Sequence, residues 1–81
     1  MTKDIALKWV ENRQYIFCVA YFNLEDNGDW KSPKSFVLLG KDRKRARAFA
    51  RDVWGDIEKV LFYPKNYIRD ARELVDQGFF C

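Results

Sequence analysis

The chain of 81 residues contains no histidine, and this absence removes several kinds of active site from consideration. Histidine is the side chain whose charge changes most readily near neutral pH, and it is the commonest protein ligand for transition metals. The acidic side chains are spread over loops and helix ends and form no obvious pair for acid–base chemistry. We therefore expect no catalytic residue, no metal site and no cofactor.

Glycine is scarce as well, with four residues, and none of them belongs to a glycine-rich phosphate-binding loop. The acidic and amide side chains at 25–29 suggest a calcium loop, but they lack the alternating oxygen ligands and the distal glutamate of such a loop. A turn is the favoured interpretation of this segment. The sequence is not expected to encode an enzyme.

Only two cysteines are present, which is few for a small secreted domain. Cys18 lies inside an apolar run at 15–22, whereas Cys81 is the last residue. A disulfide would have to join a buried strand to the end of the chain. Two free thiols are therefore favoured over a bridge.

Long hydrophobic runs are also missing. The longest spans residues 15–22, whereas a membrane-spanning helix needs about 20 apolar residues. Lys3 and Asp4 precede any apolar stretch, which is not the pattern of a signal peptide. We expect a cytoplasmic protein with no membrane partner.

Apolar residues make up 48% of the chain and aromatic residues 17%, which is typical of a folded domain. A chain this short buries only about 60% of the surface that its unfolded form exposes, so its core is thin. Each large aromatic ring offsets this by burying about 150–250 Å². The length predicts one domain that spans residues 1–81.

Alternating and continuous apolar runs predict four strands, at residues 5–10, 15–22, 35–39 and 57–63. Residues 15–22 lack polar side chains, which indicates a strand buried on both faces. The alternating Tyr15, Phe17, Val19 and Tyr21 would also suit a platform for stacking bases, and burial in a central strand is the favoured interpretation. Turns are expected at 11–14 and 26–29, so the first three strands should form an antiparallel meander.

Two helices are expected, one from Asp42 to about Trp54 and one over residues 67–77. Asp42 can cap the first helix and Gly55 can end it, whereas Asn66 can cap the second. The predicted fold is α+β with the order β-β-β-α-β-α, in which the fourth strand extends the meander into a mixed sheet with two helices. The expected core includes Phe17, Val19, Phe49, Val53, Leu61 and Leu74.

Positive charge is concentrated in one segment. Residues 41–51 contain six basic side chains and one acidic, a net charge of +5, although the whole chain carries only +3. On the expected helix, Arg43, Lys44, Arg47 and Arg51 form a stripe beside the apolar face. Neighbouring arginines four residues apart repel each other, and basic residues near a helix N-terminus oppose its dipole. The pattern therefore favours a binding role over a merely solvated helix face.

These features favour a non-enzymatic protein-binding module that docks its basic helix on an acidic surface of a larger protein or nucleoprotein complex. Arginine and tryptophan are enriched at binding hot spots. Small, aromatic-rich domains without motifs are common among phage and mobile-element proteins that inhibit host or defence machinery, anti-CRISPR proteins among them. The predicted partner-binding residues are Arg43, Lys44, Arg47, Arg51, Trp54, Trp30, Lys34 and Lys41.

Direct nucleic-acid binding by the same helix is the alternative. Its basic side chains, together with Lys34 and Lys41, would then contact phosphates. The low overall charge and the lack of a base-reading element favour the protein partner. A permanent subunit of a larger assembly is a third interpretation. The partner's identity and the oligomeric state stay open.

Overall fold

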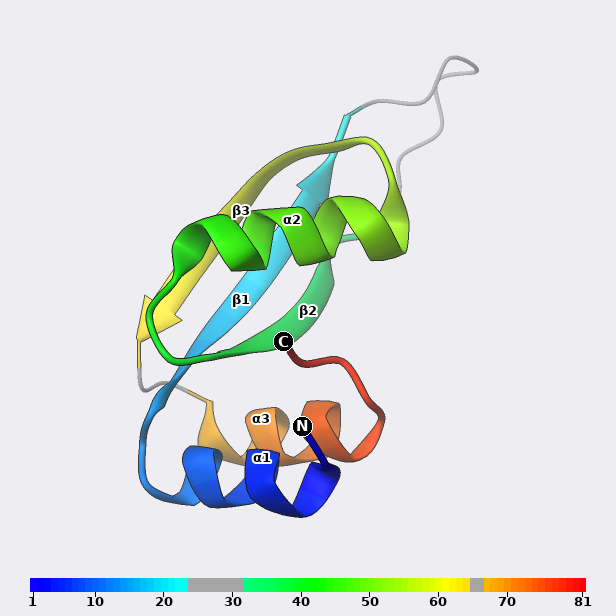
Figure 1. The fold of residues 1–81 in the computed structure, drawn as a ribbon. Helices are drawn as coiled ribbons and strands as arrows, with labels where there is room; N and C mark the ends of the chain where they lie inside the picture. Colours follow the sequence, from blue (N-terminus) through cyan, green and yellow to red (C-terminus); the bar gives the residue numbers. More distant parts are fainter. Residues whose placement is uncertain (24–31, 65–66) are drawn as a thin grey trace.

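The computed structural model describes residues 1–23, 32–64 and 67–81, which form three helices and a three-stranded sheet (Figure 1). Strand β1 is in the middle, and β2 and β3 both run antiparallel to it. The chain is therefore an α+β domain. Its elements, in order, are α1 (Lys3–Glu11), β1 (Tyr15–Phe22), β2 (Lys34–Leu39), α2 (Arg43–Trp54), β3 (Ile57–Pro64) and α3 (Ile68–Asp76).

The strand predicted at residues 5–10 is wrong, because this segment belongs to α1. The Thr2 hydroxyl caps the helix by accepting a hydrogen bond from the Ile5 amide at 3.3 Å. Ala6 and Val10, four residues apart, are fully buried, whereas Ile5 is 46% exposed. The apolar residues therefore follow the period of a helix and not that of a strand.

The predicted mixed sheet with a fourth strand is also wrong, since the described strands form an antiparallel sheet in the order β2-β1-β3. Helix α2 connects β2 to β3, and these two strands are parallel to each other with β1 between them. The last residues run along the outer edge of β2, where the Val37 amide donates to the Phe79 carbonyl at 3.0 Å. The Cys81 amide donates in turn to the Val37 carbonyl at 2.9 Å.

Several local predictions are confirmed. Residues 15–22 form the central strand, and only Val19 and Tyr21 in it are partly exposed. Asp42 caps α2 by accepting hydrogen bonds from the amides of Lys44 and Arg45. Gly55 ends the helix with a positive φ of 87°, a conformation that glycine adopts without steric cost.

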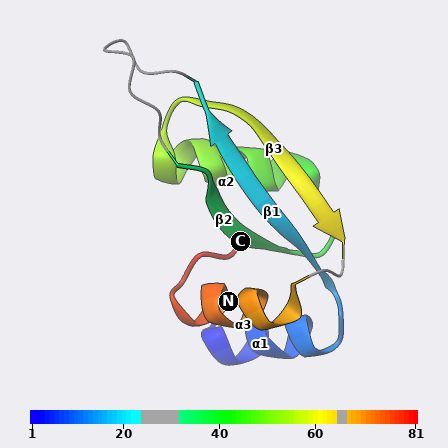
Figure 2. The same cartoon turned by 180° about the vertical axis from the view of Figure 1, so that it is seen from behind.

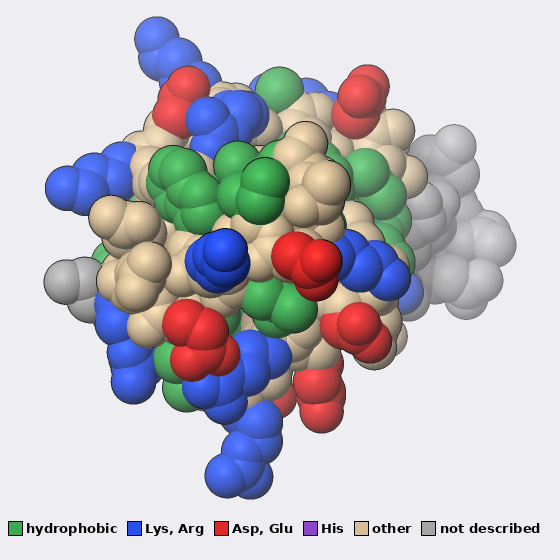
Figure 3. Space-filling view, turned by 60° about the horizontal axis from the view of Figure 1, so that its bottom comes forward, with side chains coloured by type: hydrophobic (Ala, Val, Ile, Leu, Met, Phe, Trp, Pro, Cys, Tyr) green, Lys and Arg blue, Asp and Glu red, His purple; other side chains and the backbone are tan. Residues whose placement is uncertain are grey.

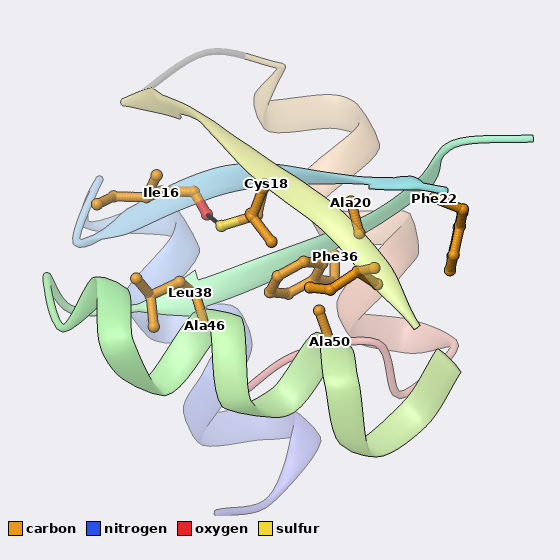
Figure 4. Packing of buried hydrophobic residues seen from close by; sticks show 10 residues of the cluster. Ile16, Cys18, Ala20, Phe22, Phe36, Leu38, Ala46 and Ala50 are labelled. Atoms are coloured by element: carbon orange, nitrogen blue, oxygen red, sulfur yellow. Dashed lines mark hydrogen bonds between the residues drawn. The ribbon is translucent and has the colours of Figure 1, made fainter. Parts of the chain in front are cut away.

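One face of the sheet packs against α2. Small side chains of the helix, Ala46 and Ala50, lie fully buried over Phe36 and Leu38 of β2 (Figure 4). Cys18 of β1 lies in the same layer, and its thiol is 3.5 Å from the Ile16 carbonyl oxygen. Alanine at these two helix positions allows α2 to approach the aromatic and aliphatic side chains of the sheet closely.

The opposite face packs against α1 and α3, which lie side by side (Figure 2). Ala6 and Val10 of α1 and Ala71 and Val75 of α3 are fully buried. The two helices cover the end of this face at which β1 begins, at Tyr15, and no helix of the described residues lies over its other end.

Two of the six predicted core residues are exposed, and the partial cover by α1 and α3 explains one of them, Leu61. Leu61 pairs with Val19 on the part of the face beyond α1 and α3, and it is 38% exposed. Val53 of α2 is 46% exposed, whereas the neighbouring Trp54 ring packs against the core on this side of the sheet. Of the remaining four, Phe17 is buried, and Val19, Phe49 and Leu74 are partly buried.

The second predicted helix is present as α3, with Tyr67 at its N-cap in a left-handed conformation (φ 59°). Three sequence-based predictions concern residues outside the described ranges: the turn at 26–29, the capping role of Asn66 and the position of Trp30.

Candidate interaction surface

Helix α2 presents its basic side chains to solvent. The burial of Ala46 and Ala50 fixes the rotation of the helix about its axis. As the sequence predicted, the resulting outer surface carries a stripe of exposed basic residues, Arg43, Lys44, Arg47 and Arg51. We refer to these four residues as the basic stripe.

Two members of the basic stripe lie over an aromatic ring of β3. The guanidinium carbon of Arg43 is 4.9 Å from the centre of the Phe62 ring, and that of Arg47 is 5.4 Å away. Such contacts stabilise by about 0.5–1 kcal/mol each at exposed sites. Phe62 was not among the predicted site residues, because only the crossover from β2 through α2 to β3 brings it beneath the helix.

Arg45 is directed elsewhere. Its guanidinium donates a hydrogen bond to the Leu39 carbonyl and lies near the thiol of Cys81. It thus ties the start of α2 to the end of β2 and to the C-terminal segment. The sequence places Arg45 in the same charged run as its neighbours, but its structural role is different.

The basic stripe has no acidic partner within the described residues. An ion pair between described residues lies elsewhere in the molecule. It joins Arg72 of α3 to Glu11 of α1, with nitrogen–oxygen distances of 2.5 and 2.9 Å. This hydrogen bond from Arg72 lowers the pKa of Glu11. Asp42, the acidic residue nearest to the stripe in the sequence, accepts backbone hydrogen bonds at the N-cap instead.

The N-terminal end of α2 borders a groove of about 820 Å³. Its lining includes Lys41 and Arg43, and also Trp9 and Arg13 from the end of α1 and the turn that follows it. Arg13 has a positive φ of 60° in this turn. The sequence did not indicate Arg13 as a site residue, because its place in the same groove as Arg43 depends on the position of α1.

The other two predicted residues within the described ranges lie at the opposite end of α2. Lys34 and Trp54 line a smaller hollow together with Phe22 and Ser32. A helix of 12 residues is about 18 Å long, so these residues are separate from the groove at Lys41.

Trp54 is a core residue more than a surface one. Its ring is stacked on that of Phe79, with centres 6.0 Å apart and an angle of 19° between the planes. It also contacts Phe36 at 5.7 Å and Phe49 at 6.1 Å between ring centres. These ring contacts give Trp54 a structural role within the fold that requires no binding partner. The side chain is still partly exposed and can contribute to an interface.

The cysteines are free thiols in different surroundings. Cys18 is fully buried on β1, and burial raises the pKa of its thiol to about 12. Burial also raises the pKa of Cys81, an effect that Arg45 opposes. Within the described residues, no cluster of three or more potential metal-ligating side chains is found, and no helix has the length and hydropathy needed to cross a membrane.

The end of the molecule formed by α1 and α3 differs from α2 in its charge. Figure 3 shows basic and acidic side chains interspersed on this surface. The two helices together carry four basic and five acidic residues. A concentration of one sign of charge is therefore a property of the α2 side.

Comparison with known proteins gives no further guide to this surface. No protein-family model matches the chain, and no curated protein or solved structure shows a significant match to it.

Proposed function

We propose that this protein is a non-enzymatic binding module that docks the basic stripe of α2 on an acidic surface of a larger protein. The observation that supports this most directly is the arrangement of Arg43 and Arg47. Both lie over the Phe62 ring, and no carboxylate of the described residues pairs with them. Their hydrogen-bond donors are therefore available for a partner's carboxylates.

The aromatic support matters for affinity. An arginine that is ordered before binding loses less side-chain entropy when the complex forms. Its planar guanidinium can then bind a carboxylate through two parallel hydrogen bonds. Phe62 thus favours a specific contact over the diffuse attraction that mobile surface lysines provide.

A protein partner is favoured over nucleic acid by the size of the basic surface. The stripe extends over one helix of about 18 Å, and the net charge of the chain is only +3. Inhibition of host or defence machinery by a phage-encoded protein is the biological setting that we propose for such a module, and an anti-CRISPR role is one form of it.

The test compares two triple variants with the same change in net charge. The first reverses Arg43, Arg47 and Arg51 to glutamate, and the second reverses Lys3, Lys8 and Arg69 on α1 and α3. Each variant and the wild-type protein capture partners from an extract of the natural host, and mass spectrometry identifies them. The proposal expects one acidic-surfaced protein to be retained by the wild type and the second variant and lost with the first.

Circular dichroism should show the same fold for all three proteins, because every substituted residue is exposed. Retention of the same partners by the Arg43, Arg47 and Arg51 variant would contradict the proposal and leave the stripe as a solvated helix face.

A further inference from the structure

Strand β3 forms an outer edge of the sheet. β1 lies on one side of it, and no other described element lies beyond its other side (Figures 1 and 2). The edge at β2 differs, because the C-terminal segment covers it with hydrogen bonds to the backbone of Val37 and Leu39. Within the described chain, the β2 edge is therefore covered by the C-terminal segment, whereas the β3 edge is uncovered.

The register determines which backbone groups of β3 point outward. Val37 and Leu39 of β2 direct their amides away from β1, toward the C-terminal segment. The β2 residues between and beside them, such as Phe36, therefore hydrogen-bond with β1, and Phe36 pairs with Cys18. Cys18 and every second residue of β1 thus hydrogen-bond with β2. The other set in β1, which includes Val19, must then hydrogen-bond with β3, and Val19 pairs with Leu61.

It follows that Leu61 directs its amide and carbonyl toward β1, whereas its neighbours Val60 and Phe62 direct theirs outward. Pro64, two residues further along, has no amide hydrogen and occupies another outward position, where proline is tolerated in an edge strand. Two consecutive donor–acceptor positions are therefore available to an added strand.

Positive charge flanks this edge on both faces of the sheet. On the α2 face, Arg43 and Arg47 lie over Phe62. On the opposite face, the Lys59 ammonium is 5.5 Å from the centre of the Tyr21 ring. Glu58 is the single acidic residue in β3, so cations predominate along the edge.

The face opposite α2 also offers apolar surface next to the edge. Leu61 is 38% exposed, and Tyr63 beside it is partly exposed. An added strand would place alternate side chains on the two faces. Its residues on the α2 face would meet the arginines, and those on the other face would meet Leu61 and Tyr63.

We propose that the partner element recognised by this protein is an extended acidic segment that adds to the sheet as a strand beside β3. This inference rests on the proposed docking of the basic stripe and specifies its mode. Main-chain hydrogen bonds to Val60 and Phe62 give affinity, and acidic side chains on alternate residues pair with Arg43 and Arg47.

A second copy of this chain fits the same edge poorly. Antiparallel pairing of two β3 edges places both α2 helices on the same face of the joined sheet. The Arg43 and Arg47 side chains of the two copies would then meet along one seam, and like charges across an interface disfavour association. The charge therefore favours an acidic segment of another protein.

The test uses a synthetic peptide of alternating glutamate and valine and a matched peptide with alternate backbone amides N-methylated. Both carry the same charge, but the methylated peptide lacks the N–H donors at alternate residues, and its methyl groups hinder the close approach that strand pairing requires. Calorimetry should show the methylated peptide binding about tenfold or more weakly. Amide exchange measured by NMR should slow about tenfold or more at Val60 and Phe62 when the unmodified peptide binds.

The outcomes separate this inference from the proposed function. Equal binding of both peptides, without protection of Val60 and Phe62, would overturn strand addition and leave docking by the basic stripe intact. Failure of the unmodified peptide to bind at low salt would also overturn strand addition. Protection of these amides in the peptide-free protein together with dimerisation would assign the edge to a second copy. Unchanged partner capture by the variant with Arg43, Arg47 and Arg51 reversed would instead refute the proposed function.

Discussion

The guanidinium carbon of Arg43 lies 4.9 Å from the centre of the Phe62 ring, which links the first turn of α2 to the outer strand of the sheet. The two residues are 19 positions apart in the sequence and meet because α2 crosses over β3. The contact therefore joins the basic stripe to the edge at which we place the partner. Its strength can be measured directly.

A double-mutant cycle of Arg43→Gln and Phe62→Leu measures this contact. The glutamine removes the charge, and the leucine removes the ring while keeping an apolar side chain. We expect a coupling free energy of about 0.5–1 kcal/mol in urea unfolding, since the site is exposed. Additive effects of the two substitutions would show that the ring does not hold the arginine.

Two apolar residues of α2, Phe49 and Val53, should respond differently to truncation. Phe49→Ala removes a ring that contacts Phe36 at 5.2 Å between centres and is expected to cost about 3 kcal/mol. Val53→Ala should cost less than about 1 kcal/mol, because Val53 is 46% exposed. Denaturation curves of both variants check this, and similar losses would contradict the placement of these side chains.

Substitution of Trp54 should affect folding before it affects binding. We expect Trp54→Ala to lower the free energy of unfolding by about 3 kcal/mol, because the ring packs against Phe36, Phe49 and Phe79. Trp54→Phe should retain most of this stability. If Trp54→Phe lowers partner affinity without lowering the melting temperature, the indole also serves the interface. An unaltered melting temperature of Trp54→Ala would contradict the core position.

The buried thiol of Cys18 should make the free energy of unfolding fall as the pH rises in the alkaline range. Its pKa is raised from 9.0 to about 12 by burial, so the folded protein binds this proton more tightly than the unfolded chain does. The resulting stabilisation is complete below about pH 9 and is lost as the pH rises from about 9 towards about 12. Over this pH range, the free energy of unfolding measured in urea should therefore fall less for Cys18→Ala than for the wild type.

The same burial predicts chemical selectivity between the thiols, because the thiolate is the reactive form. Iodoacetamide at about pH 8 should modify Cys81 well before Cys18 in the native protein, and mass spectrometry of the digested protein would locate the label. Faster modification of Cys18 would contradict its burial.

Salt dependence separates the proposed protein partner from nucleic acid. Phosphate binding by the basic stripe would give measurable affinity for random-sequence DNA, with a log–log salt slope of about −0.7 to −0.9 per contact. We expect little such affinity at physiological salt. Micromolar binding to random DNA under these conditions, lost when Arg43, Arg47 and Arg51 are reversed to glutamate, would favour the nucleic-acid alternative.

The sequence by itself determined the elements whose signals are local. The cap at Asp42 and the stop at Gly55 define α2 because each depends on backbone groups within one turn of the helix. The apolar residues 15–22 define a buried strand because a surface strand would alternate with polar residues. The concentration of positive charge in residues 41–51 is likewise read directly from the sequence.

The tertiary structure decided what depends on distant partners. Ile5, Leu7 and Trp9 alternate as in a strand, whereas Ala6 and Val10 have helical spacing, so the local pattern was ambiguous. Contacts with α3, on which Ala71 and Val75 are buried, select the helix because they bury Ala6 and Val10 on a single face.

The candidate site follows the same division. The charges of the basic stripe are a property of the sequence, but their support by Phe62 and their position beside an outer strand arise only when α2 crosses over β3. Exposure of Leu61 likewise depends on where α1 and α3 end over the sheet. Local backbone signals act over a few residues, whereas the packing of helices on a sheet joins segments that the sequence keeps far apart.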